Sequence, residues 1–142
     1  LVVLSLFQPE EGLEKSQRPD PYPDIHPYVF DFAVKEWEIV RDKVRRKVYQ
    51  GSDHFTIAYT ELYPGHEPKP HDHADVQAVL TLKNKTTYFI GDEPLDLHEN
   101  VLIASAPWVR HNSHNTFKAP VTDLEIFWPK RAALAEAINI QK

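Results

Sequence analysis

The chain has 142 residues, with 16 basic and 21 acidic side chains, a formal net charge of -5 and no cysteine. This length suits one domain with its own hydrophobic core. The acidic balance excludes nucleic acid and anionic membranes as main partners and favours a small-molecule partner. The lack of cysteine excludes disulfides, thiol nucleophiles and sulfur-ligated metals. No apolar run approaches the roughly 18 to 20 residues of a membrane helix, so we expect a soluble protein and assign it to the cytoplasm.

The N-terminal 30 residues are predicted to form an extended arm. The opening L-V-V-L-S-L-F has no basic residue before it and no cleavage site after it, so we expect a strand and not a signal peptide. The chain contains no methionine, so its numbering is expected to begin after the translated start. Within residues 9–28, Pro19, Pro21, Pro23 and Pro27 stand among charged residues and favour an extended conformation. Such a strand and arm could add to the sheet edge of a second copy, which predicts a homodimer.

Residues 31–142 are predicted to form a single all-β domain. Turn signals such as Q-G-S-D, K-N-K and G-D-E-P separate short β-rich runs, and this regular spacing is typical of a sandwich or barrel. After Pro129, the stretch R-A-A-L-A-E-A-I predicts a short C-terminal helix. The expected strands are Lys43–Tyr49, Phe55–Leu62, Val76–Leu82, Thr86–Ile90, Val101–Ser105 and Leu124–Trp128.

The stretch P-H-D-H-A-D-V-Q supplies candidate metal ligands. His71, His73 and Gln77 have even separations, so in an extended segment their side chains lie on one face. His111, after the turn-forming Pro107, is a fourth candidate. Imidazole suits several first-row metals, and a neutral glutamine oxygen leaves the ion its full charge. The alternative interpretation is a group of polar loop residues.

These residues resemble the two signature motifs of the cupin superfamily. In the first motif a glycine is followed by His-x-His and, after a short gap, usually a glutamate; in the second a proline-containing turn precedes a histidine and an asparagine. Here Gln77 replaces the glutamate, and Asn84 and Asn100 stand where glycines are common. Trp108 stands where the family usually has a small residue and could wall the pocket mouth. The matching positions are Gly65, His71, His73, Gln77, Pro107, His111 and Asn115.

The resemblance implies a double-stranded β-helix, the cupin jelly-roll barrel, with one divalent transition metal, Fe, Mn, Ni or Zn. A narrower resemblance lies in L-E-I-F-W-P-K-R, residues 124–131, which is similar to a stretch of the small single-domain cupins that linearise 4,5-unsaturated uronates. That likeness implies Glu125 as the active-site acid, Phe127 as an aromatic wall and Arg131 as a carboxylate clamp. An ordinary surface ion pair is the other interpretation of Glu125 and Arg131.

Three further sets of residues could either belong to the functional site or have an ordinary structural role. Tyr59 shares a strand face with apolar residues and either packs in the core or lines the pocket as a catalytic side chain. Arg45 and Arg46 must face opposite sides of one strand, and either could bind a substrate carboxylate or remain a solvated charge. His114 is expected at the surface or beside a ligand, and His66 in a solvent-exposed turn.

Three functions fit this set of residues. The first is a metal-dependent enzyme that opens, isomerises or cleaves a small oxygen-bearing acid such as a sugar acid. The second is a non-haem iron dioxygenase, which needs a redox-active metal. The third is a cupin that binds a metal or small molecule without catalysis.

Overall fold

The computed structural model describes residues 29–51, 54–131 and 134 as nine β-strands and their connections. The expected strand Leu1–Phe7, the proline-rich arm and most of the predicted C-terminal helix lie outside these residues. The all-β prediction is confirmed. The strands are β1 (Glu38–Arg41), β2 (Val44–Gly51), β3 (Phe55–Leu62), β4 (Val76–Lys83), β5 (Lys85–Ile90), β6 (Glu93–His98), β7 (Leu102–Ser105), β8 (His111–His114) and β9 (Val121–Trp128).

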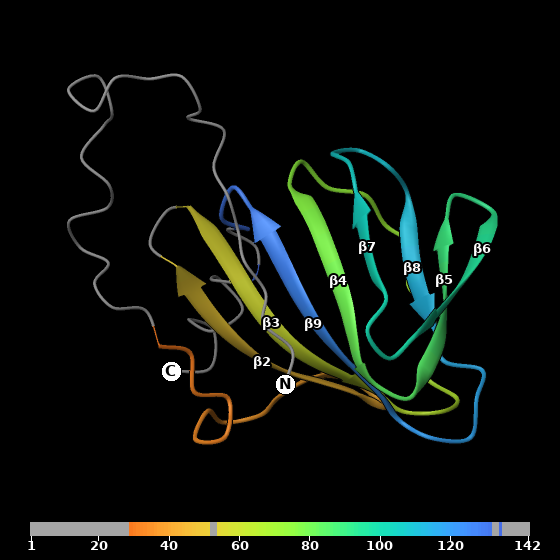
Figure 1. The fold of residues 1–142 in the computed structure, drawn as a ribbon, viewed down its shortest axis with the longest axis horizontal. Helices are drawn as coiled ribbons and strands as arrows, with labels where there is room; N and C mark the ends of the chain where they lie inside the picture. Colours follow the sequence, from red (N-terminus) through yellow and green to blue (C-terminus); the bar gives the residue numbers. More distant parts are fainter. Residues whose placement is uncertain (1–28, 52–53, 132–133, 135–142) are drawn as a thin grey trace.

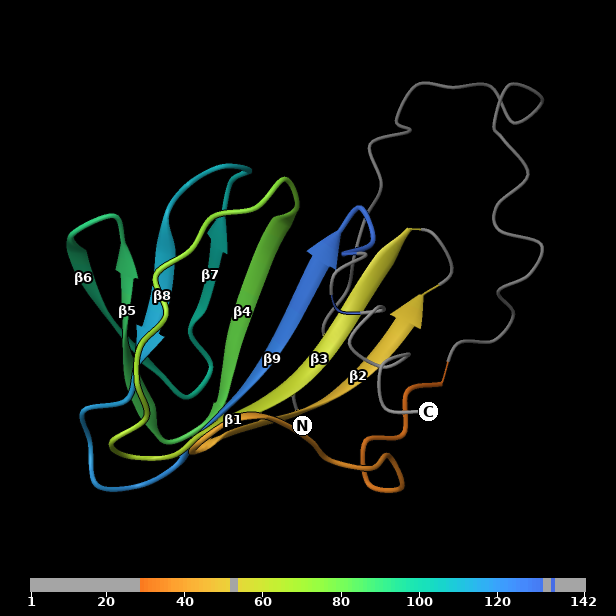
Figure 2. The ribbon, with the colours of Figure 1, turned by 180° about the vertical axis from the view of Figure 1, so that it is seen from behind.

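Two antiparallel sheets enclose the interior. The larger has the strand order β1-β2-β3-β9-β4-β7, and the smaller the order β6-β5-β8. Figure 1 shows the sheets facing each other and converging where β4 passes into β5, and Figure 2 shows the same arrangement from behind. Strand β9, the last of the described strands, pairs with β3 on one side and β4 on the other. Its side chains therefore lie at the centre of the larger sheet.

Left-handed backbone positions make the tight connections between strands. Asn84 has a φ of 64° between β4 and β5, and Asn100 has a φ of 69° before β7. Asparagine tolerates this region better than other residues with a Cβ, so both can replace glycine. The Asn84 side chain also donates from Nδ2 to the Pro120 carbonyl at 2.7 Å, which ties the β4–β5 turn to the start of β9.

The inner faces of the sheets meet in an apolar core. Val79 of β4 packs against Tyr88 of β5 and Leu97 of β6, and all three are buried. A second cluster joins Val48, Ala58 and Phe127 of the larger sheet to Leu134, which is helical. Each buried residue of this size stabilises the fold by about 1.5 to 3 kcal/mol.

The outer face of β2 and β3 is covered by the segment that precedes β1. Phe32 stacks on Tyr59 with ring centroids 5.4 Å apart, and Trp37 lies 5.9 Å from the same ring. The Arg45 guanidinium lies 4.0 Å from the Trp37 ring centre. Since neighbouring residues of a strand face opposite sides, Arg46 points to the interior. In the part of the chain that the structure describes, no helix is long and apolar enough to span a bilayer.

Candidate metal centre and substrate pocket

Three histidines converge inside the barrel. One ring nitrogen from each of His71, His73 and His111 lies within 4.8 Å of the others. His71 and His111 are held together by two backbone hydrogen bonds, from His71 N to the His111 carbonyl at 3.0 Å and from His111 N to the His71 carbonyl at 2.9 Å. This bridge brings the loop before β4 against the start of β8. Among the described residues, these three histidines are the one group of three or more His, Cys, Asp or Glu side chains whose potential ligand atoms lie close enough to hold a metal ion.

Gln77 completes the cluster from the larger sheet. Its Oε1 lies 3.0 Å from His73 Nε2 and 2.9 Å from His111 Nε2. Gln77 is buried in β4, where it pairs with Phe127 of β9 and Ser105 of β7. Because both neighbouring strands hold this position, the amide is fixed between the two imidazoles.

Backbone carbonyls fix the orientation of all three imidazoles. The Nδ1 atoms of His71, His73 and His111 lie 2.7, 2.9 and 2.7 Å from the carbonyl oxygens of Lys69, Asp75 and Val109. A carbonyl can only accept, so each Nδ1 carries a proton and donates. In the neutral ring Nε2 then holds a lone pair that faces the cluster, the tautomer that a metal ligand needs.

Burial keeps two of these imidazoles neutral. The pKa of His111 is lowered to about 4, mainly by desolvation and to a smaller extent by the neighbouring His71 and His73, while the bond to the Val109 carbonyl acts in the opposite direction. The pKa of His71 is also lowered, mainly by burial. Neither ring therefore carries a second proton that a metal ion would have to displace at neutral pH.

The four candidate ligands lie together, but the local structure that brings them together differs from the one expected from the sequence. We expected an extended segment with His71, His73 and Gln77 on one face, but residues 72–75 form a loop and β4 begins at Val76. The loop is held by Trp108, whose backbone N–H donates to the His73 carbonyl at 2.8 Å. The residues still converge because the loop turns His73 back towards Gln77.

A cavity of about 480 Å³ opens beside the cluster. His71, Gln77 and His111 line it, together with Glu125 and Arg131. The positions expected for the active-site acid and the carboxylate clamp therefore share one cavity with three of the four candidate ligands. The volume falls in the range of small-molecule sites, which is about 300 to 1,000 Å³.

Glu125 occupies the central strand β9 at the wall of this cavity. Burial raises the pKa of its carboxyl, an effect opposed first by Arg131 and then by Arg46. The Arg131 guanidinium lies 4.9 Å from the Phe127 ring centre, so the aromatic side chain packs against the planar cation. Burial lowers the pKa of Arg131, with Glu125 acting against that shift. The carboxyl, the aromatic ring and the guanidinium thus form one wall.

Two cavity-lining arginines were not assigned to the site from the sequence. Arg46, expected as either a substrate contact or a solvated charge, lines the cavity and is held by Glu38 at 3.2 Å. Arg41, at the end of β1, also lines the cavity and donates from Nε to the Glu67 carbonyl at 3.3 Å. β1 has only four residues, E-I-V-R, and two of them are charged, so the sequence does not predict a strand there. The position of Arg41 at the cavity therefore follows only from the fold.

Two residues expected at the pocket lie elsewhere. Tyr59 points to the outer face of the larger sheet, against Phe32 and Trp37, whereas Thr60 beside it lines the cavity. The expectation that Tyr59 reaches the pocket is therefore wrong, because strand alternation places its ring on the other face. Trp108 has a φ of 62°, is 70% exposed and does not line the cavity, so it does not wall the mouth.

The asparagine of the second motif has a structural role. Asn115 is buried and donates from Nδ2 to the carbonyls of Leu62 and Ala119, both at 2.8 Å. Its backbone N–H donates to His66 Nε2 at 3.0 Å. The expectation of a solvent-exposed His66 is therefore wrong, since its ring is buried as a hydrogen-bond acceptor. His114 lies beside it, 5.9 Å between ring centroids, and not in the cluster.

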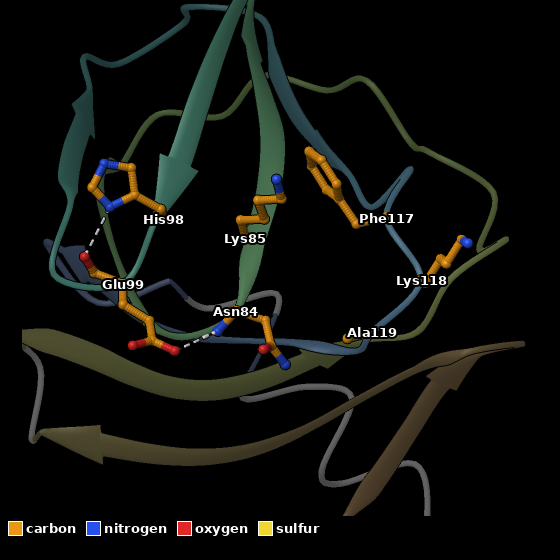
Figure 3. A pocket seen from close by; sticks show the side chains of 7 residues that line it. All are labelled: Asn84, Lys85, His98, Glu99, Phe117, Lys118 and Ala119. Carbon is orange, nitrogen blue, oxygen red and sulfur yellow. Dashed lines mark hydrogen bonds between the residues drawn. The ribbon is translucent and has the colours of Figure 1, made fainter.

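A second hollow, of about 500 Å³, lies at the other end of the barrel. Figure 3 shows the side chains around it, including Asn84, Lys85, Glu99 and Phe117. The Asn84 backbone N–H donates to Glu99 Oε1 at 3.0 Å, and the Lys85 ammonium lies 4.3 Å from the Phe117 ring centre. These polar groups contact one another or the ring and do not converge on a common point, so the first cavity is the candidate site.

Comparison with known proteins adds the fold class. The sequence matches no protein-family model and no curated protein sequence. The structure is similar to KdgF from Halomonas sp., with a TM-score of 0.71 and 15% identity over 76% of this chain and 98% of that chain. A RmlC-like cupin from Shewanella frigidimarina gives a TM-score of 0.68 and 15% identity over 75% of this chain and 94% of that chain.

A more distant match is the DMSP lyase DddQ from Ruegeria pomeroyi, with a TM-score of 0.59 and 16% identity over 68% of this chain and 57% of that chain. Together these similarities show that the chain has the double-stranded β-helix fold of the cupins. The predicted fold class is thereby confirmed. Its histidine triad could hold a metal ion.

Proposed function

We propose that this protein is a metal-dependent cupin enzyme that acts on a small organic acid. The observation that carries the proposal is the convergence of one ring nitrogen from each of three histidines with the Gln77 oxygen, while every Nδ1 lies at hydrogen-bond distance from a carbonyl. The proposed ligands are His71, His73, Gln77 and His111.

The arrangement fits a divalent transition metal. Gln77 Oε1 lies 2.9 Å from His111 Nε2 and 3.0 Å from His73 Nε2. With the proton of each ring on Nδ1, these are contacts between acceptor atoms that have no proton between them. A cation removes that conflict. Two ligands about 2.1 Å from one ion and at right angles are about 3.0 Å apart, which agrees with both separations. With its amide rotated, Gln77 would instead donate to both rings, and metal titration distinguishes the two arrangements.

The ligand set is neutral, so a bound divalent ion would keep its full charge and supply Lewis-acid polarisation of a substrate oxygen. The chain's own residues do the rest. Arg131 binds the substrate carboxylate, because a guanidinium matches a carboxylate with two parallel hydrogen bonds. Glu125 exchanges a proton with the carbon or oxygen next to the polarised centre, since burial raises the pKa of its carboxyl and so makes that group easier to protonate. Phe127 and Tyr88 wall the cavity and exclude water.

The reaction class that we propose is ring opening, isomerisation or elimination on a sugar acid. Its support is the stretch L-E-I-F-W-P-K-R, because Glu125, Phe127 and Arg131 come from it and form one wall of the cavity. These reactions all move a proton beside a carboxylate or carbonyl, which an acid, a clamp and a Lewis acid accomplish together.

Metal content, a 4,5-unsaturated uronate assay and an oxygen electrode test the proposal together. We expect about one first-row ion per chain in the wild type, its loss in His111→Ala, and metal-dependent decay of the uronate's ultraviolet absorbance. Metal-dependent oxygen uptake with small acids and no uronate decay would replace the proposal with a dioxygenase. Metal binding with neither activity would replace it with a binding protein. Absence of metal in wild type and after loading would overturn the metal centre itself.

A further inference from the structure

The candidate cavity is lined by more basic than acidic side chains, the acidic ones being Asp72 and Glu125. Four cationic side chains line it, and two of them have carboxylate partners: Arg46 is paired with Glu38 at 3.2 Å, and Lys69 with Glu67 at 3.1 Å. The ion pairs within the described part of the chain include neither Arg41 nor Arg131. Those two arginines are the cations left for a ligand.

Both arginines line the cavity together with Glu125. Each interacts electrostatically with the Glu125 carboxyl. Arg41 ends β1 at one edge of the larger sheet, whereas Arg131 follows β9 at its centre. The two guanidinium groups therefore approach the cluster from different elements, which gives the cavity two separate anchoring points for anionic groups.

Both guanidinium groups have lost part of their hydration without gaining an ion pair. Desolvation is the largest influence on each of their pKa values, and it acts downwards. The exposed Arg110, by contrast, does not line the cavity. A partly buried cation without a partner is costly, and a bound anion offsets that cost. A ligand with a single carboxylate would satisfy one arginine and leave the other.

We propose that the cavity is built for a small molecule with two acidic groups, the first bound by Arg131 and the second by Arg41. This inference rests on the proposed function of the same cavity, since it names the class of acid on which the enzyme acts. It does not rest on a metal ion, because the two arginines alone provide the two positive charges. Arg41 is thus a specificity-determining residue that selects dianions over monoanions of equal size.

Binding of a matched pair of sugar acids tests this assignment. Glucuronate and glucarate share a six-carbon skeleton but carry one and two carboxylates. Their dissociation constants are measured by calorimetry on the full chain, metal-free and metal-loaded, at fixed ionic strength. 6-Phosphogluconate is the third probe, because its second acidic group is a phosphate.

We expect the wild type to bind glucarate or 6-phosphogluconate at least tenfold more tightly than glucuronate, and the tighter of the two identifies the second group as carboxylate or phosphate. Arg41→Gln should remove most of that preference while changing glucuronate binding less than twofold. Arg131→Gln should weaken all three probes. Arg41→Lys should retain part of the preference because it keeps the charge.

Lys118→Gln is the control, since it removes the same charge from an exposed residue of the other hollow and should change nothing. Equal weakening of all probes by Arg41→Gln, an equal effect of Lys118→Gln, or no binding of either dianion by the wild type would overturn the proposal. Metal content measured on the same samples separates this outcome from a failure of the metal centre. Arg41-dependent dianion preference in protein that takes up no metal would uphold this assignment alone.

Discussion

The Gln77 side-chain oxygen lies 2.9 Å from Nε2 of His111, although the two residues are 34 positions apart and belong to different sheets. Gln77 belongs to β4 of the larger sheet and His111 to β8 of the smaller sheet. The candidate centre therefore joins the two layers of the barrel, and a change at either residue should be felt by the other.

Gln77→Glu should bind a divalent ion at least about tenfold more tightly than the wild type. The substitution keeps an oxygen at the same place and adds a negative charge within bonding distance of the ion, and charge interactions in a buried site are worth more than in water. Competition with a calibrated chelator measures the change. Gln77→Ala should weaken binding, and equal affinities for all three proteins would show that the amide is not a ligand.

Glu125→Gln should lower turnover of the uronate by about 10²- to 10⁴-fold, which is the usual contribution of a general acid or base. Metal content should stay at the wild-type level because Glu125 is outside the proposed ligand set. Arg131→Ala should mainly raise KM if the clamp holds ground and transition states alike. Glu93→Gln, at an exposed position of β6, is the control. Unchanged kcat in Glu125→Gln would remove that residue from the mechanism.

The contribution of Asp123 to the stability of the metal-free protein should fall as pH rises from about 4 to about 7. Burial raises the pKa of Asp123 from 3.8 to about 7, and Glu125 adds to the shift while the hydrogen bond from Thr81 opposes it. Within that window the folded chain keeps a proton that the unfolded chain has released, so the unfolded state gains as pH rises. The effect is complete above about pH 7 and amounts to at most about 4 kcal/mol.

Asp123→Asn removes that titration, so the Tm of the variant should rise relative to that of the wild type as pH increases across the same window. Asp92→Asn, at an exposed turn, should leave the wild-type profile unchanged. Parallel profiles for wild type and Asp123→Asn would show that the buried carboxyl does not control stability. The side chain's Oδ2 is buried without a partner in the structure, and a proton on that atom gives it a donor.

Asn115→Ala should destabilise the fold by about 2 to 4 kcal/mol. The substitution leaves the carbonyls of Leu62 and Ala119 and the Phe117 N–H without the side chain that satisfies them, and each unsatisfied buried group costs about 1 to 3 kcal/mol. Thr116→Ala, at the exposed neighbouring position, should change stability by less than about 0.5 kcal/mol. Denaturant unfolding of the two variants measures the difference.

The homodimer expected from the N-terminal strand and arm stays a prediction. Light scattering of the full chain at micromolar concentration should give twice the mass of one chain. A monomer under those conditions would contradict the expected pairing of the arm with a second barrel.

The strands predicted from the sequence are those whose residues suit a buried sheet. β3 begins and ends where expected, because F-T-I-A-Y-T-E-L is rich in β-branched and aromatic residues. β6 and β8 gave no such signal. The first contains Pro94, which is usually excluded from central strands, and the second consists of the four polar residues H-N-S-H. Pairing with β5, and not local preference, makes both of them strands.

The candidate ligands could be named from the sequence because their spacing is demanding, whereas the cavity around them could not. Arg41 and Tyr59 illustrate the difference. Each is placed by the pairing of its strand within the larger sheet, and one position along a strand moves a side chain to the other face. Sequence alone left that choice open for Arg45 and Arg46 as well, and the fold settled it by turning Arg46 to the cavity.

The three imidazoles are oriented by the carbonyls of Lys69, Asp75 and Val109, which are main-chain atoms present whatever side chain each position carries. Libraries randomised at positions 69 and 109 should therefore keep the ligand geometry in most members, apart from those that distort the loops. The rim of the site can change its chemistry while the centre stays in place. Position 69, which lines the cavity, is accordingly a natural starting point for changing which acid the cavity binds.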